Sequence, residues 1–273
     1  MKRDEAVLRE LNLYPLWKLR EGGGQAAGSP AASSLRRVRE GGGEAVTETA
    51  APQEDAQVAE AAPATVEPAV LPPEKNREQV IGELGWSELK AMVRDCSACK
   101  LRAGCTQTVF GIGDEKADWL FVGEGPGADE DTRGEPFVGQ AGKLLDNMLM
   151  SIKLKRGRNV YIANIVKCRP PNNRAPAPDE VATCMPYLQR QITLIKPRLI
   201  VALGKTAATS LLGRDASIAS MRGKLHDFHG TPLLVTYHPA YLLRTPLDKA
   251  KAWQDLCLAV ETMKCRTTPG KSA

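Results

Sequence analysis

The chain has 273 residues, of which 25% are charged and 42% hydrophobic, a composition typical of a globular protein with one or two domains. No apolar run approaches the roughly 20 residues that span a bilayer. The acid-containing N-terminus lacks the long apolar core of a secretory signal. These features argue against a membrane or secreted protein, and we expect a cytoplasmic one.

The net charge of +5 is unevenly distributed along the chain. Residues 1–75 hold 9 Lys/Arg against 12 Asp/Glu, a net charge of −3, so residues 76–273 hold 28 against 20, a net charge of +8. A basic folded part favours a polyanionic partner such as nucleic acid, although a solubilising surface would look the same.

The first 76 residues differ in amino-acid composition from the rest of the chain. Residues 1–20 predict a short helical segment whose apolar residues at 11–17 suit either a frayed terminal helix or a motif that docks on a protein partner. Residues 21–76 are rich in Gly, Ala, Pro, Glu and Ser, and cannot bury enough apolar surface to offset the entropy of ordering. We predict a disordered linker there and a disordered tail at 266–273.

Residues 77–265 predict one α/β domain. Four continuous apolar runs indicate buried strands at 119–123, 160–165, 199–203 and 233–237. Helical patterns precede, separate and follow them at 87–93, 141–151, 179–195, 205–211 and 247–263. Such alternation predicts a three-layer α/β/α fold with a central four-stranded parallel sheet.

Polar or glycine-rich residues follow all four predicted strands. They are Gly123 to Gly127 after the first strand, Asn164 at the end of the second, Gly204-Lys205-Thr206 after the third and His238 after the fourth. Because ligands bind at the carboxyl edge of open α/β sheets, we expect a ligand site there.

The chemistry of these residues narrows the ligand. The amide of Asn164 offers an acceptor beside a donor, which matches N3–H and O4 of uracil and mismatches cytosine. Gly204-Lys205-Thr206 is similar to the end of a phosphate-binding P-loop, but Leu199 stands where its first glycine belongs, which excludes a nucleoside triphosphatase. The turn still suits one backbone phosphate at a helix N-terminus.

Seven cysteines in a chain expected to be cytoplasmic argue against a disulfide framework. Cys96 and Cys99 have metal-ligand spacing, and Cys168 and Cys184 bracket a proline-rich loop. Four thiolates suffice for one tetrahedral Zn²⁺ or one [4Fe–4S] cluster, and spacing alone does not choose between them. Cys105 is a further candidate ligand.

Together these motifs resemble a known family. Gly-Glu-Gly-Pro-Gly at 123–127, Pro-Phe-Val-Gly-Gln-Ala-Gly at 136–142, Asn-Ile-Val-Lys-Cys-Arg-Pro-Pro at 164–171 and His-Pro-Ala at 238–240 are similar to the family four uracil-DNA glycosylases. The resemblance covers about residues 84–263. It implies a hydrolase that releases uracil from single- and double-stranded DNA in base excision repair, with a [4Fe–4S] cluster on Cys96, Cys99, Cys168 and Cys184. Because no Lys is clearly placed to form a Schiff base, we expect a monofunctional enzyme that does not cut the strand. We also expect a monomer that is associated with the nucleoid.

The resemblance implies roles for individual residues. Phe137 would stack on the flipped uracil, Asn164 would read its Watson–Crick edge, and His238 would donate a hydrogen bond toward uracil O2. Glu124 and the backbone of Gly125 would lie beside the base and the attacking water, within a backbone wall that includes Gly123.

Contacts to DNA are expected from loops around the site. Gly204, Lys205, Thr206, Pro170 and Pro171 would hold the backbone. Leu242 would enter the base stack as an apolar wedge. Arg244 is a further expected DNA contact.

One departure from better-known members of the superfamily concerns catalysis. Gly125 and Gly127 stand where those members carry an Asp beside the water and a Tyr that excludes thymine. Catalysis should therefore depend on stabilising the uracil leaving group.

Two other classes of protein remain as alternatives. One is a non-catalytic DNA-binding module, stapled by iron–sulfur or zinc, that recruits a polymerase. The other is a zinc-dependent hydrolase, which would need an open metal site with His or carboxylate ligands.

Overall fold

The structure, a computed structural model, describes residues 76–267, and side chains as far as residue 265. The predicted docking segment (1–20) lies outside the described residues, as do almost all of the predicted linker (21–76) and tail (266–273). Within the described part of the chain, helices and strands begin at Arg77.

The strands form one six-stranded mixed sheet in the order β1-β3-β2-β4-β6-β5. The strands are β1 (Ile112–Gly113), β2 (Trp119–Gly123), β3 (Val160–Asn164), β4 (Leu199–Leu203), β5 (Leu225–Phe228) and β6 (Thr231–Thr236). The four central strands run parallel, which confirms the predicted parallel sheet, while β1 and β5 pair antiparallel at the edges. Both edge strands were missed because β1 has two residues and β5 is mostly polar or exposed.

Helices cover the sheet on both faces. They are α2 (Arg77–Glu83), α3 (Trp86–Arg94), α4 (Ala128–Arg133), α5 (Gln140–Ser151), α6 (Pro178–Ile195), α7 (Lys205–Leu212), α8 (Ile218–Met221), α9 (Pro239–Arg244) and α10 (Lys249–Thr267). Among residues 76–267, short 3₁₀ turns lie at Lys100–Gly104, Pro171–Asn173 and Pro246–Asp248.

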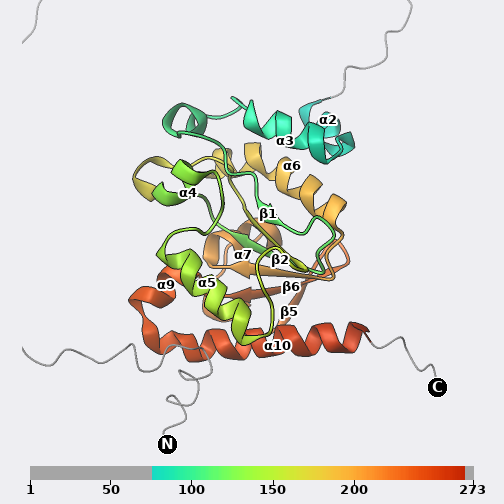
Figure 1. Cartoon of the computed structure of the whole chain (residues 1–273), viewed down its shortest axis with the longest axis vertical. Coiled ribbons are helices and arrows are strands. Elements are labelled where there is room, and N and C mark those ends of the chain that lie inside the picture. Colours follow the sequence, from blue (N-terminus) through green and yellow to red (C-terminus); the bar gives the residue numbers. More distant parts are fainter. Residues whose placement is uncertain (1–75, 268–273) are drawn as a thin grey trace, which may run out of the picture. The chain divides into compact units, whose positions relative to one another are not determined.

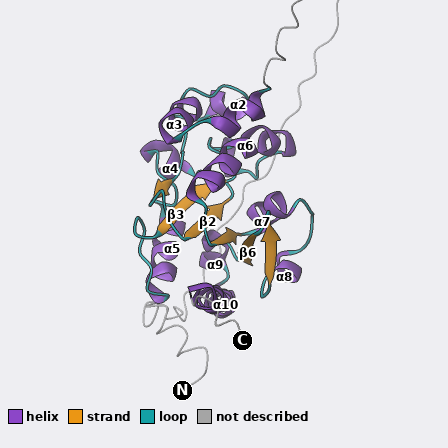
Figure 2. Ribbon diagram, turned by 90° about the vertical axis from the view of Figure 1, so that its right-hand side faces the viewer, coloured by secondary structure: helices purple, strands orange, loops and turns teal. Residues whose placement is uncertain are grey.

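Alternate residues of each central strand pack into two separate cores. Leu120 and Val122 of β2 face a core shared with α2, α3, α6 and α7. Trp119 and Phe121 face the opposite core, shared with α5 and α10. Figures 1 and 2 show the sheet between α6 and α10. This three-layer arrangement explains why β2, β3 and β4 are apolar along their whole length.

The parallel register brings four strand ends to one edge. Gly123 pairs with Asn164, and Leu203 pairs with Thr236, so the loops after these strands lie side by side.

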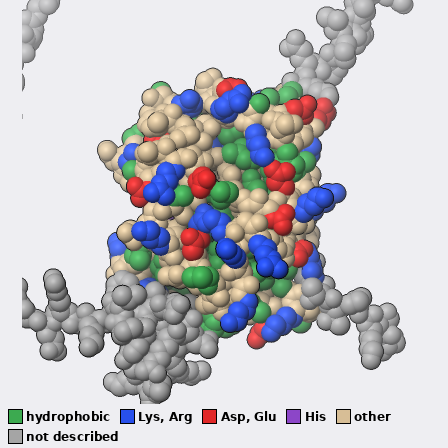
Figure 3. All heavy atoms as spheres, viewed as in Figure 1, with side chains coloured by type: hydrophobic (Ala, Val, Ile, Leu, Met, Phe, Trp, Pro, Cys, Tyr) green, Lys and Arg blue, Asp and Glu red, His purple; other side chains and the backbone are tan. Residues whose placement is uncertain are grey.

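In the part of the chain that the structure describes, no helix has the length and apolarity needed to cross a membrane. Figure 3 shows Lys and Arg side chains spread over one face, with Asp and Glu among them.

Candidate active site

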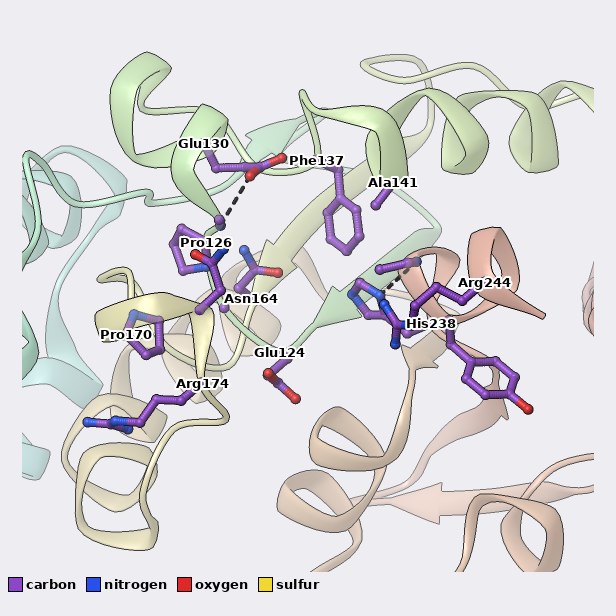
Figure 4. A pocket seen from close by; sticks show the side chains of 15 residues that line it. Glu124, Pro126, Glu130, Phe137, Ala141, Asn164, Pro170, Arg174, His238 and Arg244 are labelled. Carbon is purple, nitrogen blue, oxygen red and sulfur yellow. Dashed lines mark hydrogen bonds between the residues drawn. The ribbon is translucent and has the colours of Figure 1, made fainter. Parts of the chain in front are cut away.

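A cavity of about 450 Å³ opens at the carboxyl edge of the sheet. Figure 4 shows its side chains converging from the loops after β2, β3 and β6 and from the start of α5. The lining residues are Glu124, Gly125, Pro126, Gly127, Glu130, Phe137, Ala141, Asn164, Pro170, Asn173, Arg174, His238, Ala240, Tyr241 and Arg244. The cavity thus gathers most of the predicted catalytic and base-binding residues.

Two neighbouring rings form part of the cavity wall. The ring centroids of Phe137 and His238 are 5.5 Å apart, with the planes inclined by 30°. Gly123 lies behind the wall, since a Cβ there would come within 2.5 Å of both Phe137 Cζ and Asn164 Oδ1. A side chain at position 123 would therefore collide with both, and only glycine lets the Phe137 ring and the Asn164 amide lie so close to the end of β2.

Asn164 presents an unmatched acceptor. Its side chain is 2% exposed, and its Oδ1 is buried without a hydrogen-bond partner among the described residues. Buried polar atoms normally have partners, so this oxygen has its acceptor capacity left for a donor that the chain itself does not supply.

The imidazole of His238 is held as a donor toward the cavity. The backbone N–H of Ala240 donates to Nδ1 at 3.1 Å. Burial, with the Arg244 charge nearby, lowers the pKa of His238 to about 4, and Glu130 opposes the shift. The ring is therefore neutral at pH 7, with its proton on Nε2 and available to a ligand.

Glu124 and Gly125 line the cavity beside the end of β2. The Thr206 hydroxyl donates a hydrogen bond to Glu124 Oε2, which fixes the carboxylate. A Cβ at Gly125 would lie 2.8 Å from Val166 Cγ2, so the loop packs closely on the segment after Asn164.

Comparison with known proteins agrees with this geometry. Residues 110–257 match the model of the uracil DNA glycosylase superfamily, which is more than half of the chain. The Type-4 uracil-DNA glycosylase of Archaeoglobus fulgidus is 46% identical over 162 residues, covering 56% of this chain and 81% of the relative. The Type-4 enzyme of Thermotoga maritima is 47% identical over 154 residues, covering 56% and 80%. That of Pyrobaculum aerophilum is 41% identical over 179 residues, covering 63% and 91%.

The chain belongs to the type-4 uracil-DNA glycosylase family. The family was predicted from four motifs, and residues of all four line one cavity. Segments far apart in the sequence therefore converge on a single site, as the resemblance implied.

The four predicted metal ligands surround a second, mostly apolar cavity between α3, α6 and the loop after β3. Cys96, Cys99, Cys168 and Cys184 all line it. Within residues 76–265, no three His, Cys, Asp or Glu side chains converge closely enough to hold one metal ion.

Burial also affects the protonation of two of these thiols. Burial raises the pKa of the Cys184 thiol to about 11 and that of Cys168 well above its usual range. Both thiols therefore keep their protons unless a metal replaces them.

Lys167 forms hydrogen bonds both with Cys184, which lines the cysteine cavity, and with Asn164, which lines the cavity at the sheet edge. Its backbone N–H donates to Cys184 Sγ at 3.3 Å, and its buried Nζ donates to the Asn164 carbonyl at 3.0 Å and to Gln191 Oε1 at 2.6 Å. Burial lowers the pKa of Lys167 to about 8. Lys167 thus connects the end of β3, where Asn164 lies, to Cys184.

The predicted DNA-binding residues are only partly gathered at the cavity. Pro170 and Arg244 line it, whereas Pro171 lies in the next 3₁₀ turn. Gly204 packs under His238, since a Cβ there would lie 2.9 Å from His238 Cβ. Lys205 forms an exposed salt bridge with Asp215.

The prediction that Leu242 is the wedge is wrong. Its side chain is 1% exposed and packs with Leu144, Met148, Ala252 and Leu256 in a third core between α5, α9 and α10. Leaving that core would cost a cavity, so Leu242 holds α9 in place instead.

Several cavity residues were missed from sequence. Arg174 is held by a bidentate pair with Glu180, which lowers the pKa of that carboxyl to about 2. Tyr241 donates to Asp248 at 2.6 Å. Glu130 accepts from three backbone amides, and its position three residues after the N-cap Gly127 is a capping signature that could have revealed it.

The lowered pKa of His238 predicts a pH dependence of stability. The pKa of His238 in the folded protein is about 4, against an ordinary 6.5, so the unfolded chain binds a proton at this residue more tightly than the folded protein does. The contribution of the neutral ring is complete above pH 6.5 and is lost as pH falls toward 4. We expect the free energy of unfolding of wild type, relative to His238→Gln, to fall over this range by on the order of 2 kcal/mol. A difference that stays constant between pH 7 and 4 in urea titrations would refute the lowered pKa.

Proposed function

We propose that this protein is a uracil-DNA glycosylase, which hydrolyses the bond between uracil and deoxyribose and leaves an abasic site. The observation that carries the proposal is the orphan Oδ1 of Asn164, which faces a cavity walled by an aromatic ring. A uracil lying on Phe137 could donate its N3–H to this acceptor, whereas cytosine offers an unprotonated nitrogen there.

The proposed reaction begins with the uracil flipped out of the DNA stack. The C1′–N1 bond breaks and its electron pair leaves with uracil, while Nε2–H of His238 donates to uracil O2, where the negative charge collects. Water then bonds to C1′, and the proton it loses balances the charge on uracil. Glu124, oriented by the Thr206 hydroxyl, orients this water.

For the cysteine cavity we propose a [4Fe–4S] cluster held by Cys96, Cys99, Cys168 and Cys184. Its role would be structural, because four thiolates leave no open coordination position for chemistry. Through Lys167 it would fix the end of β3, and with it the amide of Asn164.

DNA would run across the mouth of the cavity, held through its phosphates. Arg244 at the cavity and exposed Lys205 supply positive charge, with Pro170 and the Gly204 turn as close backbone contacts. We further propose that the protein acts as a cytoplasmic, nucleoid-associated monomer, and that residues 11–17 bind a protein partner.

With Leu242 buried, we propose Leu247 as the apolar wedge. Leu247 is 89% exposed, in the turn Pro246–Asp248 directly after α9. The bond from Tyr241 to Asp248 ties this turn to the cavity wall. Leu247 is the most exposed of the large apolar side chains that the structure describes. An apolar wedge that fills the space left by a flipped base has to be accessible in this way before DNA binds.

Leu247→Ala should slow uracil release from duplex DNA roughly tenfold and leave release from single strands unchanged, because only a duplex has to be unstacked. Fluorescence of 2-aminopurine placed beside the uracil would report the flipping step. Leu225→Ala, at an exposed residue of β5, is the matched control. Equal rates of wild type and Leu247→Ala on duplex DNA would exclude the wedge.

The function itself is tested with purified protein, uracil-containing oligonucleotides and alkali, which cleaves DNA at abasic sites. We expect cleavage of single-stranded and U·G substrates only after alkali treatment. Tight DNA binding without uracil release would instead favour the non-catalytic binding module.

A further inference from the structure

The loop that carries Phe137 is held by two charged side chains that the proposed reaction does not itself use. We infer that Glu130 and Arg156 are positioning residues that fix Phe137 for stacking on the flipped base, an inference that rests on the proposed function. Glu130 lies in α4 and Arg156 in the turn before β3. They reach the same loop from different directions and bind opposite kinds of backbone group.

Glu130 binds the backbone N–H groups. Its Oε1 accepts from Val138 at 2.9 Å and from Gly139 at 3.0 Å, directly after Phe137. Its Oε2 accepts from Gly127 at 3.1 Å, in the glycine-rich loop. One carboxylate therefore joins the stacking loop to the loop on the other side of the base pocket. The dashed line at Glu130 in Figure 4 marks its bond with Gly127.

Arg156 binds the carbonyl groups of the same loop. Its Nη1 donates to the Pro136 carbonyl at 2.8 Å and its Nη2 to the Phe137 carbonyl at 2.7 Å. Its Nε donates to Asp146 of α5 at 3.0 Å, which fixes the guanidinium plane. The peptide groups on both sides of Phe137 are thus held by charge-assisted hydrogen bonds.

The backbone of Phe137 needs such support. Its φ of 56° lies in the left-handed region, which a bulky residue adopts only when its surroundings impose it. The start of α5 also packs closely against the backbone of Phe137, since a Cβ at Gly142 would lie 1.8 Å from the Phe137 carbonyl oxygen. Without the two charged residues, the loop would relax toward an ordinary conformation and move the ring away from the base.

Glu130 also lines the cavity, so a direct catalytic role has to be weighed. Three amide donors already occupy both of its oxygens, which leaves little capacity to accept a proton or hold a water. Its geometry is that of a support for two loops. We therefore assign Glu130 to positioning, and the acid that acts on water remains Glu124.

A positioning role predicts a selective loss. Phe137 would contact the base and not the backbone, so loosening it should weaken recognition of uracil while leaving abasic DNA unaffected. Glu130→Gln keeps the shape but has one acceptor oxygen, so its NH₂ group must face an N–H donor. Arg156→Met removes the donors to both carbonyls and provides a second, independent variant on a partly exposed side chain.

The experiment measures binding of each variant to DNA carrying a non-cleavable uracil nucleotide and to the same DNA with a stable abasic-site analogue. For Glu130→Gln and Arg156→Met we expect roughly tenfold weaker binding of the uracil DNA, unchanged binding of the abasic DNA and a roughly 10- to 100-fold slower single-turnover rate. Arg156→Lys should recover part of the loss. Glu135→Gln makes the same charge change at an exposed position of this loop and should match wild type.

Two outcomes would overturn the inference. One is a folded Glu130→Gln variant with the wild-type preference for uracil DNA over abasic DNA. The other is an equal loss of both affinities together with a lowered melting temperature, which would mean a general structural role. Failure of the proposed function would appear differently, as wild-type protein that releases no uracil at all.

Discussion

Replacing His238 with alanine should slow uracil release by roughly 100- to 1000-fold, the usual cost of removing one preorganised donor at a developing anion. The ring is held neutral with Nε2–H directed at the cavity, so it needs no reorganisation as charge builds on uracil. Because the interaction strengthens only as the bond breaks, the loss should appear in the single-turnover rate and not in affinity for uncleaved DNA.

The control for this variant is His229→Ala, at an exposed histidine after β5. It should keep the wild-type rate. Full activity of His238→Ala would remove the leaving-group donor from the mechanism, and an equal loss in rate and DNA affinity would reassign His238 to binding.

Replacing Cys168 or Cys184 with serine should cost the protein the proposed cluster and much of its stability. Both cysteines are buried, and a metal site that is absent from the unfolded chain contributes its binding energy to folding. We expect loss of iron and of broad visible absorbance, and a melting temperature lower by roughly 10 °C or more. Uracil release should fall with the folded fraction, because the cluster fixes Asn164 only through Lys167.

Cys105→Ser provides the matched comparison. Cys105 is partly buried beside Cys168, but it does not line the cavity that the four predicted ligands surround. The Cys105→Ser variant should retain its iron and its visible absorbance. Iron loss in Cys105→Ser with retention in Cys184→Ser would reverse the ligand assignment, and zinc in place of iron in wild type would reject the cluster.

Continuous apolar runs made the centre of the fold predictable. A strand buried on both faces has no polar alternation, so β2 and β4 were predicted with the bounds they have. The carboxyl edge of a parallel sheet then placed Asn164 and His238 near one another without knowledge of side-chain geometry. The edge strand β5 lacked that signal because its residues are largely exposed.

The two largest differences from the sequence-based expectations concern Leu242 and the acids after Gly127, and both depend on contacts that hydrophobic patterns do not reveal. Leu242 belongs to the short helix α9, whose buried face is decided by packing against α5, which is distant in sequence, and against α10, which follows it closely. From the sequence, no role is assigned to the acids after Gly127. In the structure, Glu130 binds backbone amides, and buried Asp131 accepts from Thr106 and Gln107. Their charge serves the protein's own loops, which explains acids so close to a site expected to meet phosphates.

The most direct test of the proposed function is detection of the free base. Wild-type protein would be incubated with three oligonucleotides that differ only in carrying uracil, cytosine or thymine at one position, and released bases would be identified by mass spectrometry. We predict free uracil from the first, no cytosine from the second, and a strand that stays intact until alkali is added. Absence of free uracil, or release of cytosine at a comparable rate, would contradict the role assigned to Asn164 and with it the proposed function.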